Sequence, residues 1–369
     1  MKIVIAPDSF KGCLPAWEVA AALAGGIRRA DPAAEIIEVP LADGGEGSLA
    51  VFQRALGGKL LTVPAHDALM RPKEAQFAMC GATAVVELAQ TCGIGSIEQL
   101  SPLAATTYGF GEVLRAAIAS GAERVIACIG GSASTDGGAG LAQALGVRFY
   151  EQSGAEIAPG IGGGDLARIA RAVVPQKPPC QIVIASDVTA PLFGESGAAV
   201  VFSPQKGASP EEVALLDAAL RGYARAVDDN GESAGDGAAG GSGFALRKFF
   251  GARAVSGAEL MIEATALKEK MRGAAALITG EGRSDASTLQ GKLCAEVAAI
   301  AGELKIPVIL ASGAVAEQEK LAQLFTEIHA VSPAGMPLAE AISRAAELLE
   351  CFAFKWALSR LDCKPCRND

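Results

Sequence analysis

The sequence lacks several features that would place the protein in a common class. An excess of basic residues is absent, because the formal net charge is −9, so the basic footprint of a nucleic-acid-binding protein is missing. No apolar run approaches the roughly 18 residues that a membrane-spanning helix needs. The apolar run at the amino terminus ends at Asp8 and is too short for a signal peptide. We therefore expect neither a nucleic-acid partner nor a membrane partner.

Two common nucleotide-binding signatures are also missing. The P-loop pattern G-x-x-x-x-G-K-[ST] does not occur, since Gly291-Lys292 is followed by Leu293 and lacks the earlier glycine. No clean G-x-G-x-x-G follows the first predicted strand, which disfavours a dinucleotide-binding dehydrogenase. Only two histidines are present, His66 and His329, so a histidine-based metal site or catalytic triad is poorly supported.

The nine cysteines form no recognisable disulfide or metal framework. Their number is odd and most lie in apolar contexts, so we expect reduced thiols in a cytoplasmic protein. Cys363 and Cys366 have the spacing of half a zinc site, but a lone pair cannot complete a tetrahedral site. We expect this tail to carry no function.

Short apolar runs, typical of buried parallel strands, alternate with helical spacing at both ends of the 369-residue chain. The predicted strands are 3–6, 36–39, 276–278, 307–310 and 328–331. They predict an α/β protein of two α/β domains: a discontinuous flavodoxin-like parallel sheet from residues 1–65 and 273–369, and an inserted mixed α/β domain over 66–272. A single long final helix is predicted from a stripe of Leu338, Ile342, Ala345, Leu349 and Phe352.

The inserted segment has its own predicted strands, at 84–88, 125–129 and 182–185. A helix is predicted to begin after Ser209, because Pro210 suits the first helical position and Glu212 completes a capping box. The glycine-rich stretch 231–243 has two interpretations, a flexible linker or a mobile active-site loop.

Acidic or glycine-rich turns follow several predicted strands, and in open α/β sheets ligands bind beyond the carboxyl ends of the strands. Phosphoryl transfer needs backbone that can approach phosphate oxygens, cations for the phosphates, and carboxylates that hold magnesium or orient the attacking hydroxyl. The sequence offers each kind near these turns. They are the glycines and hydroxyls of 130–138, the cations Lys11, Arg283 and Lys292, and the carboxylates Asp8, Asp43, Asp136, Asp187 and Asp285.

Each turn alone also has a purely structural interpretation. A glycine after a strand is commonly a simple turn residue, and Asp136 would serve as the cap of a helix that carries Leu141 and Leu145. Lys292 would then be a solvated surface residue. This interpretation does not account for five acidic turns at predicted strand ends, so phosphoryl transfer is the favoured hypothesis.

The same motifs, in this order and over nearly the whole chain, resemble those of the bacterial glycerate kinase type I family. Each motif alone is weak, and the set together is specific. The matching segments are Ile5-Ala6-Pro7-Asp8-Ser9-Phe10-Lys11-Gly12, 42–47, 106–109, 129–133, 136–140, 186–188, 191–192, 204–207, 237–241 and 279–283, with Asp285, Thr288 and 291–292.

The resemblance implies an ATP- and magnesium-dependent kinase with its active site in the cleft between two domains. It implies D-glycerate as the small-molecule substrate, and 2-phosphoglycerate in preference to 3-phosphoglycerate as the product. We expect ATP to contact Gly130, Gly131, Ser132, Asp136 and Lys292. The catalytic residues are expected to be Asp187, Asp285, Lys11, Asp43 and Arg283, with Asp187 and Asp285 also as the metal ligands. The resemblance does not say which carboxylate accepts the proton. It also leaves the oligomeric state open, and a homo-oligomer is one of the possibilities.

Two departures from the family pattern bear on the acceptor. Ser287 stands where a glutamine is usual, and Ser284 where an aliphatic residue is usual. Two alternatives therefore stay open: a kinase of another small hydroxy acid or polyol, and a non-catalytic metabolite-binding protein on the same scaffold. The second is disfavoured, because a binder of an anionic metabolite gains nothing from clustered carboxylates.

Overall fold

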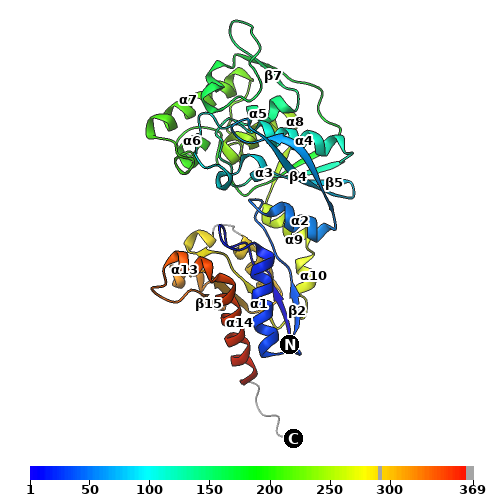
Figure 1. Cartoon of the computed structure of the whole chain (residues 1–369), viewed down its shortest axis with the longest axis vertical. Coiled ribbons are helices and arrows are strands. Elements are labelled where there is room, and N and C mark those ends of the chain that lie inside the picture. The colour runs from blue at the N-terminus through cyan, green and yellow to red at the C-terminus, as the bar shows by residue number, and fades with distance from the viewer. Residues whose placement is uncertain (290–292, 363–369) are drawn as a thin grey trace. The chain divides into compact units, whose positions relative to one another are not determined.

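The computed structural model describes residues 1–289 and 293–362. Within it the chain forms two compact units, Met1–Asp43 with Ala258–Asp369 and Gly44–Gly257 (Figure 1). Lys292 and the Cys363 and Cys366 tail lie outside the described residues. None of the cysteines in the described part forms a disulfide. No helix over these residues combines the length and the apolar character needed to cross a membrane.

A five-stranded parallel sheet forms the centre of the first unit. Its strand order is β2-β1-β11-β13-β15, and every neighbouring pair is parallel. Numbered within this unit, that is the 2-1-3-4-5 order of flavodoxin-like sheets, so the predicted discontinuous sheet is confirmed. The strands are β1 (Lys2–Ile5), β2 (Glu35–Glu38), β11 (Ala276–Thr279), β13 (Val308–Ser312) and β15 (Glu327–Ala330), with a small pair β12 (Arg283–Ser284) and β14 (Ala314–Val315).

Helices α1 (Ala16–Ala30) and α14 (Ala345–Asp362) pack along each other (Figure 1). Leu23 and Leu349 are completely buried in the core that these helices share with the sheet. A Cβ atom on Gly26 would lie 2.2 Å from the carbonyl oxygen of Glu350, so only glycine permits this approach. The unit's other helices are α9 (Gly257–Ala264), α10 (Leu267–Met271), η5 (Ala286–Leu289), α11 (Leu293–Glu303), α12 (Gln318–Leu321) and α13 (Leu338–Ser343).

The prediction of one long final helix is wrong. Helix α13 ends before Arg344, and α14 begins at Ala345. Leu338 is 76% exposed and Ile342 is 43% exposed, so neither continues the apolar face of α14. Helical spacing of apolar residues was the whole basis of the prediction, and spacing does not report whether the side chains reach a core.

A six-stranded mixed sheet forms the centre of the second unit, as the predicted second α/β domain requires. Its order is β10-β9-β6-β5-β4-β3. The β3–β4 and β4–β5 pairs are antiparallel, and the β5–β6, β6–β9 and β9–β10 pairs are parallel. Strand β3 joins this sheet although it precedes the predicted boundary at residue 66. The strands are β3 (Lys59–His66), β4 (Pro72–Cys80), β5 (Thr83–Glu87), β6 (Arg124–Cys128), β9 (Gln181–Ala185) and β10 (Arg253–Val255), with a separate pair β7 (Arg148–Tyr150) and β8 (Arg171–Val173).

Helices of this unit bury an aromatic cluster in which Phe149, Tyr223 and Phe244 are completely buried. The predicted capping box is confirmed at α7: the Ser209 Oγ accepts from the Glu212 N–H, and the Ser209 N–H donates to Glu212 Oε2. The helices are α2 (Ser48–Leu56), α3 (Ala89–Cys92), η1 (Ile94–Ser96), α4 (Tyr108–Ala119), α5 (Ala139–Ala144), η2 (Gly163–Arg168), α6 (Ala198–Phe202), η3 (Pro204–Lys206), α7 (Pro210–Ala226), η4 (Ala238–Gly241) and α8 (Ser242–Phe250).

The glycine-rich stretch 231–243 is folded into this unit, so the linker interpretation is wrong. It forms turns, the short helix η4 and the start of α8. Asp236, Ala238 and Gly240 are buried. The composition suggested a solvated chain, but small residues also allow the backbone to pack closely against neighbouring turns.

Candidate active site

In the first unit, the predicted charged residues lie at the carboxyl ends of β1, β2 and β11. Lys11, after β1, and Asp43, after β2, form an ion pair with a Nζ–Oδ2 distance of 2.8 Å. They are 32 residues apart in the chain and meet because β1 and β2 are neighbouring parallel strands. The Lys11 side chain is 66% exposed, so its ammonium is accessible to a ligand.

Asp8 is the buried carboxylate of this sheet edge, with 6% of its surface exposed. Its Oδ1 accepts a hydrogen bond from the Ser9 N–H at 2.7 Å. Burial and the negative charge of Asp43 raise the pKa of Asp8 to about 7, although Lys11 opposes the shift. A carboxyl group with this pKa exchanges a proton readily at neutral pH, as a general base must.

The turn after β11 is organised by hydroxyl groups around Glu281. The Thr288 Oγ1 and the Ser284 Oγ both donate to Glu281 Oε1, at 2.7 Å and 3.0 Å. The Ser284 Oγ also lies 2.8 Å from the Ser312 Oγ at the end of β13. Glu281 thus links two strand ends. It was not among the predicted site residues, although it stands inside one of the matching motifs.

Asp285 and Arg283 lie on the same turn. The Arg283 Nε is 3.6 Å from Asp285 Oδ2, and the Arg283 side chain is 70% exposed. Asp285 Oδ1 accepts hydrogen bonds from the Ser287 N–H at 2.9 Å and the Ser287 Oγ at 2.6 Å. Ser287, one of the two departures from the family pattern, therefore acts directly on the Asp285 carboxylate.

In the second unit, a cavity of about 230 Å³ lies at the carboxyl ends of β6 and β9. A larger hollow of about 680 Å³ lies beside α6 and α7, and none of the predicted site residues lines it. The smaller cavity is lined by Gly130, Gly131, Ser132, Ser186, Gln205, Lys206, Ala239 and Gly240, with Ile94, Ile129, Val188 and Phe202 as its apolar part. Three of the predicted ATP contacts, Gly130, Gly131 and Ser132, therefore line the same cavity.

Lys206 brings a positive charge to this cavity and was not among the predicted site residues. It is only 2% exposed. Its Nζ donates to the Ser132 Oγ at 2.9 Å and to the carbonyl oxygen of Ser134 at 2.5 Å. Burial lowers the pKa of the Lys206 ammonium to about 8. Both acceptors are uncharged oxygens, so the ammonium keeps its attraction for an anion such as phosphate.

Gly130 lets another glycine-rich turn pack against the end of β6. Its N–H donates to the carbonyl oxygen of Gly44 at 3.1 Å, and a Cβ atom at this position would lie 2.6 Å from the Cα of Gly45. The buried Glu87 carboxylate holds the same turn, because it accepts from the Gly47 N–H at 3.2 Å and the Leu49 N–H at 2.8 Å. The predicted acidic turn thus forms part of the support of the cavity.

Asp136 does not line the cavity and is completely buried. Its carboxylate accepts from the Thr107 Oγ1 at 2.6 Å, the Thr107 N–H at 2.8 Å, and the N–H groups of Gly138 and Gly140 at the start of α5. Burial raises the pKa of Asp136 despite these donors. These contacts are those of a buried cap that joins α4 and α5.

Asp187 is exposed at the end of β9, where its Oδ1 accepts from the Gly257 N–H at 3.2 Å. It belongs to the second unit, whereas Asp285 belongs to the first. Over residues 1–289 and 293–362, no three His, Cys, Asp or Glu side chains gather into a metal-binding group. Magnesium in phosphoryl-transfer sites is usually held by one or two carboxylates together with substrate phosphates, and single aspartates fit that mode.

The structure therefore brings some of the predicted residues together and leaves others apart. The first unit joins Lys11 to Asp43 and Arg283 to Asp285, and the second lines one cavity with residues 130–132. Asp187 lies at the end of β9 outside that lining, Asp136 is buried and does not line the cavity, and Lys292 lies outside the described residues. The ammonium and hydroxyl of the cavity fit a phosphate, and the carboxylates of the first unit fit a hydroxyl group that must lose a proton.

Comparison with known proteins gives one consistent result. Residues 3–357 match the model of the glycerate kinase family. A glycerate kinase of Halalkalibacterium halodurans is 39% identical, over 94% of this chain and 95% of that protein. A glycerate 2-kinase of Escherichia coli is 40% identical, over 86% of each chain. A crystal structure from Salmonella typhimurium LT2, provisionally named glycerate kinase 2, has a TM-score of 0.83 and 38% identity and covers 98% of both chains.

Proposed function

Because the chain belongs to the glycerate kinase family, it is a kinase, and we propose that it transfers the γ-phosphoryl group of ATP to the C2 hydroxyl of D-glycerate. The observation that carries the proposal is the buried Lys206 ammonium beside Ser132 in the cavity of the second unit. A buried cation next to a hydroxyl and glycine backbone is the chemistry that a polyphosphate needs.

The cavity of the second unit is the proposed phosphate site. Lys206 and Ser132 would hold phosphate oxygens by charge and hydrogen bonding, and Gly130 and Gly131 would leave room for them. Magnesium, when bound with the nucleotide, would neutralise phosphate charge, with Asp187 and Asp285 as the proposed protein ligands.

The first unit is the proposed acceptor site. Lys11 and Arg283 have exposed cationic groups that would bind the glycerate carboxylate or the transferred phosphoryl group. During transfer the C2 oxygen forms a bond to the γ-phosphorus, and the bond from that phosphorus to the β,γ-bridging oxygen breaks, which releases ADP. The hydroxyl proton passes to a carboxylate. Asp43, Asp187 and Asp285 are the predicted acceptors, and we add Asp8 because its pKa lies at about 7.

The residues proposed to bind phosphate and the residues proposed to bind the acceptor belong to different units of the chain. We therefore propose that one substrate pair engages both units, as the resemblance to the family implies. Substitutions on either side should then reduce the same activity, the coupled transfer from ATP to glycerate.

The test is a coupled assay for ADP release with D-glycerate, ATP and magnesium, followed by phosphorus–proton coupling measurements on the product by NMR. Glycerate-dependent ADP release with the phosphate on C2 is the expected result. Phosphate on C3 would overturn the assignment of the acceptor oxygen.

A panel of hydroxy acids and polyols separates the remaining outcomes. Release only with another member of the panel would assign a different acceptor, and the Ser287 contact with Asp285 is where its cause would be sought. If ATP is not turned over with any member of the panel, that result would overturn the proposed phosphoryl transfer in favour of metabolite binding.

A further inference from the structure

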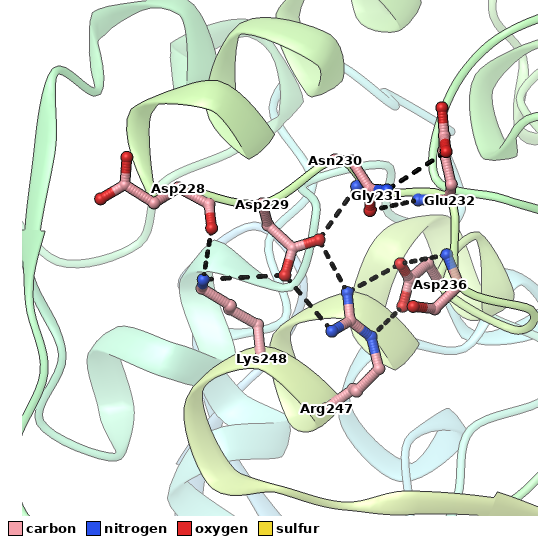
Figure 2. Close-up of polar contacts among 9 residues, drawn as sticks. Asp228, Asp229, Asn230, Gly231, Glu232, Asp236, Arg247 and Lys248 are labelled. Carbon is pink, nitrogen blue, oxygen red and sulfur yellow. Dashed lines mark hydrogen bonds and ion pairs between the residues drawn. The ribbon is translucent and has the colours of Figure 1, made fainter.

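A network of charged side chains lies at the start of a loop that lines the cavity of the second unit, and none of its residues is assigned to the reaction. Figure 2 shows the Arg247 guanidinium between the carboxylates of Asp229 and Asp236. It donates to Asp236 through Nε at 2.6 Å and Nη2 at 2.8 Å, and to Asp229 through Nη2 at 3.0 Å and Nη1 at 3.3 Å. We call these three residues the Arg247 clamp. Two forked contacts fix the planar guanidinium in position and orientation.

The clamp is partly buried, which makes its parts depend on one another. The Asp236 side chain is 1% exposed and that of Arg247 is 30% exposed. Burial raises the pKa of Asp236 even though Arg247 opposes the shift. Removing Arg247 would leave a buried carboxylate without its counter-charge, so the segment that carries Asp236 could not keep its place.

That segment leads directly into the cavity wall. The Asp236 carbonyl oxygen accepts from the Phe244 N–H at 3.1 Å, which closes the loop 236–244. Within this loop Ala239 and Gly240 line the cavity, with φ angles of +51° and +65°. A left-handed conformation at an alanine persists only where the surrounding contacts hold it, and the clamp is the charged contact at the start of the loop.

The wall in turn contacts the group that holds Lys206. The Gly137 N–H donates to the Gly240 carbonyl oxygen at 2.9 Å. A Cβ atom on Gly240 would lie 2.1 Å from the carbonyl oxygen of Ser134, so the two backbones are in direct contact. That same Ser134 oxygen accepts from the Lys206 Nζ. Packed contacts therefore run from the clamp through Gly240 to the cavity's ammonium.

We propose that Arg247 is a positioning residue: together with Asp229 and Asp236 it holds the Ala239–Gly240 wall and the Ser134 carbonyl in place, and so sets the affinity of the cavity for ATP. The identity of the ligand, ATP, rests on the proposed function. The claim that the Arg247 clamp holds the Ala239–Gly240 wall does not depend on the proposed function.

Three variants and one control test it. Arg247→Gln removes the charge, Arg247→Lys keeps the charge without the fork, and Asp229→Asn leaves the buried Asp236 pair in place. The control is Arg168→Gln, because Arg168 also joins two carboxylates of this unit, Glu151 and Asp165, and does not line the cavity.

Two measurements on each protein separate positioning from general destabilisation, and steady-state kinetics supplies the KM for D-glycerate. Amide hydrogen exchange of the ligand-free protein reports on the wall, and calorimetric titration with ATP and magnesium reports the Kd. For Arg247→Gln we expect faster exchange confined to 229–244 and a Kd for ATP raised about 10-fold, the loss typical when groups that support a binding site are removed. We expect less than about a 2-fold change in the KM for D-glycerate, smaller effects in Arg247→Lys and Asp229→Asn, and none in Arg168→Gln.

Unchanged exchange at 237–241 in Arg247→Gln would overturn the inference, as would an unchanged Kd for ATP. Faster exchange across the whole second unit would also overturn it, because the role would then be general stability. If Arg247→Gln does not fold, Asp229→Asn decides by the same two readings. A wild-type protein that does not bind ATP would contradict the proposed function, while the exchange data would still decide whether the clamp holds the wall.

Discussion

The two units present different chemistry at the carboxyl ends of their parallel strands. At the ends of β1, β2 and β11 the first unit gathers Asp8, Asp43 and Glu281, with Lys11 paired to Asp43. At the ends of β6 and β9 the second unit gathers glycines, Ser132 and the buried Lys206. The carboxyl ends of parallel strands thus supply carboxylates in the first unit and a cation with hydroxyls in the second. A phosphoryl transfer from ATP to a hydroxyl group needs both sets.

The largest predicted effect comes from removing the cation of the second unit. Lys206→Ala should lower kcat/KM for ATP by about 1,000-fold, because a buried charge that stabilises phosphate oxygens is lost. The wild-type kcat/KM for ATP should also decline as the pH rises through about 8, where the Lys206 ammonium loses its proton. Steady-state kinetics across pH measures both.

The exposed Lys59 of the same unit provides the matched control, and Lys59→Ala should retain activity. An active Lys206→Ala enzyme would contradict the role of the second unit as the source of the cation for phosphate. A wild-type pH profile that stays flat above pH 8 would contradict it as well.

The second prediction compares one predicted metal ligand from each unit. Asp187→Ala and Asp285→Ala should each lower turnover at least about 100-fold, as expected for losing a metal ligand or a base. Raising the magnesium concentration should restore part of the activity where the residue holds metal, and none where it accepts the proton.

Asp165→Ala is the control, because the Asp165 side chain is half-exposed and forms an ion pair with Arg168. Near-normal turnover in Asp187→Ala or Asp285→Ala would exclude that residue from the mechanism.

The third prediction concerns the backbone contact that supports the cavity. Gly130→Ala should lower activity about 10-fold, since a misplaced supporting element typically costs this much or more, and the new Cβ would lie 2.6 Å from the Gly45 Cα. Thermal unfolding measured alongside the kinetics would show whether the unit itself is weakened.

Gly222→Ala in α7 is the matched change, because a Cβ atom there would meet nothing within 4 Å. It should keep full activity and stability. Equal effects of the two substitutions would mean that the close approach of the 44–47 turn has no role.

The smallest predicted effect is on the pH dependence of stability in the first unit. The pKa of Asp8 is raised from 3.8 to about 7, so the folded state binds the proton more tightly than the unfolded state does. The resulting stability is complete below about pH 4 and is lost as the pH rises to about 7.

Asp8→Asn should therefore make the slope of the unfolding free energy against pH less negative in that window, by at most about 1.4 kcal/mol per pH unit. Denaturant unfolding at several pH values measures the slope, with the exposed Glu18→Gln as control. Identical slopes in Asp8→Asn and the wild type would contradict the raised pKa.

Much of the fold could be predicted from local patterns. The apolar runs located the strands of the flavodoxin-like sheet, and Ser209 with Glu212 located the start of α7. Strand β3 was not predicted, because its pairing with β4 depends on a partner that the β3 residues do not specify. The final helix was misjudged for a related reason, since Leu338 and Ile342 have core-like spacing but no core to reach.

The candidate site, like the fold, could be predicted only in part. Turns after strands identified Lys11, Asp43 and residues 130–132, because neighbouring parallel strands end at the same sheet edge. Lys206 was missed although its segment matched a family motif. A lysine in a Pro-Gln-Lys-Gly turn resembles a surface residue until the partners that bury it are known.

The sequence by itself determined where strands, turns and capped helices begin, because those choices depend on residues a few positions apart. Only the tertiary structure decided what each polar group contacts. Lys206 meets Ser132 across 74 residues of chain, and Asp136 meets Thr107 across 29. Such pairs form because packing brings distant segments together and buries them, and a buried polar group without a partner costs free energy.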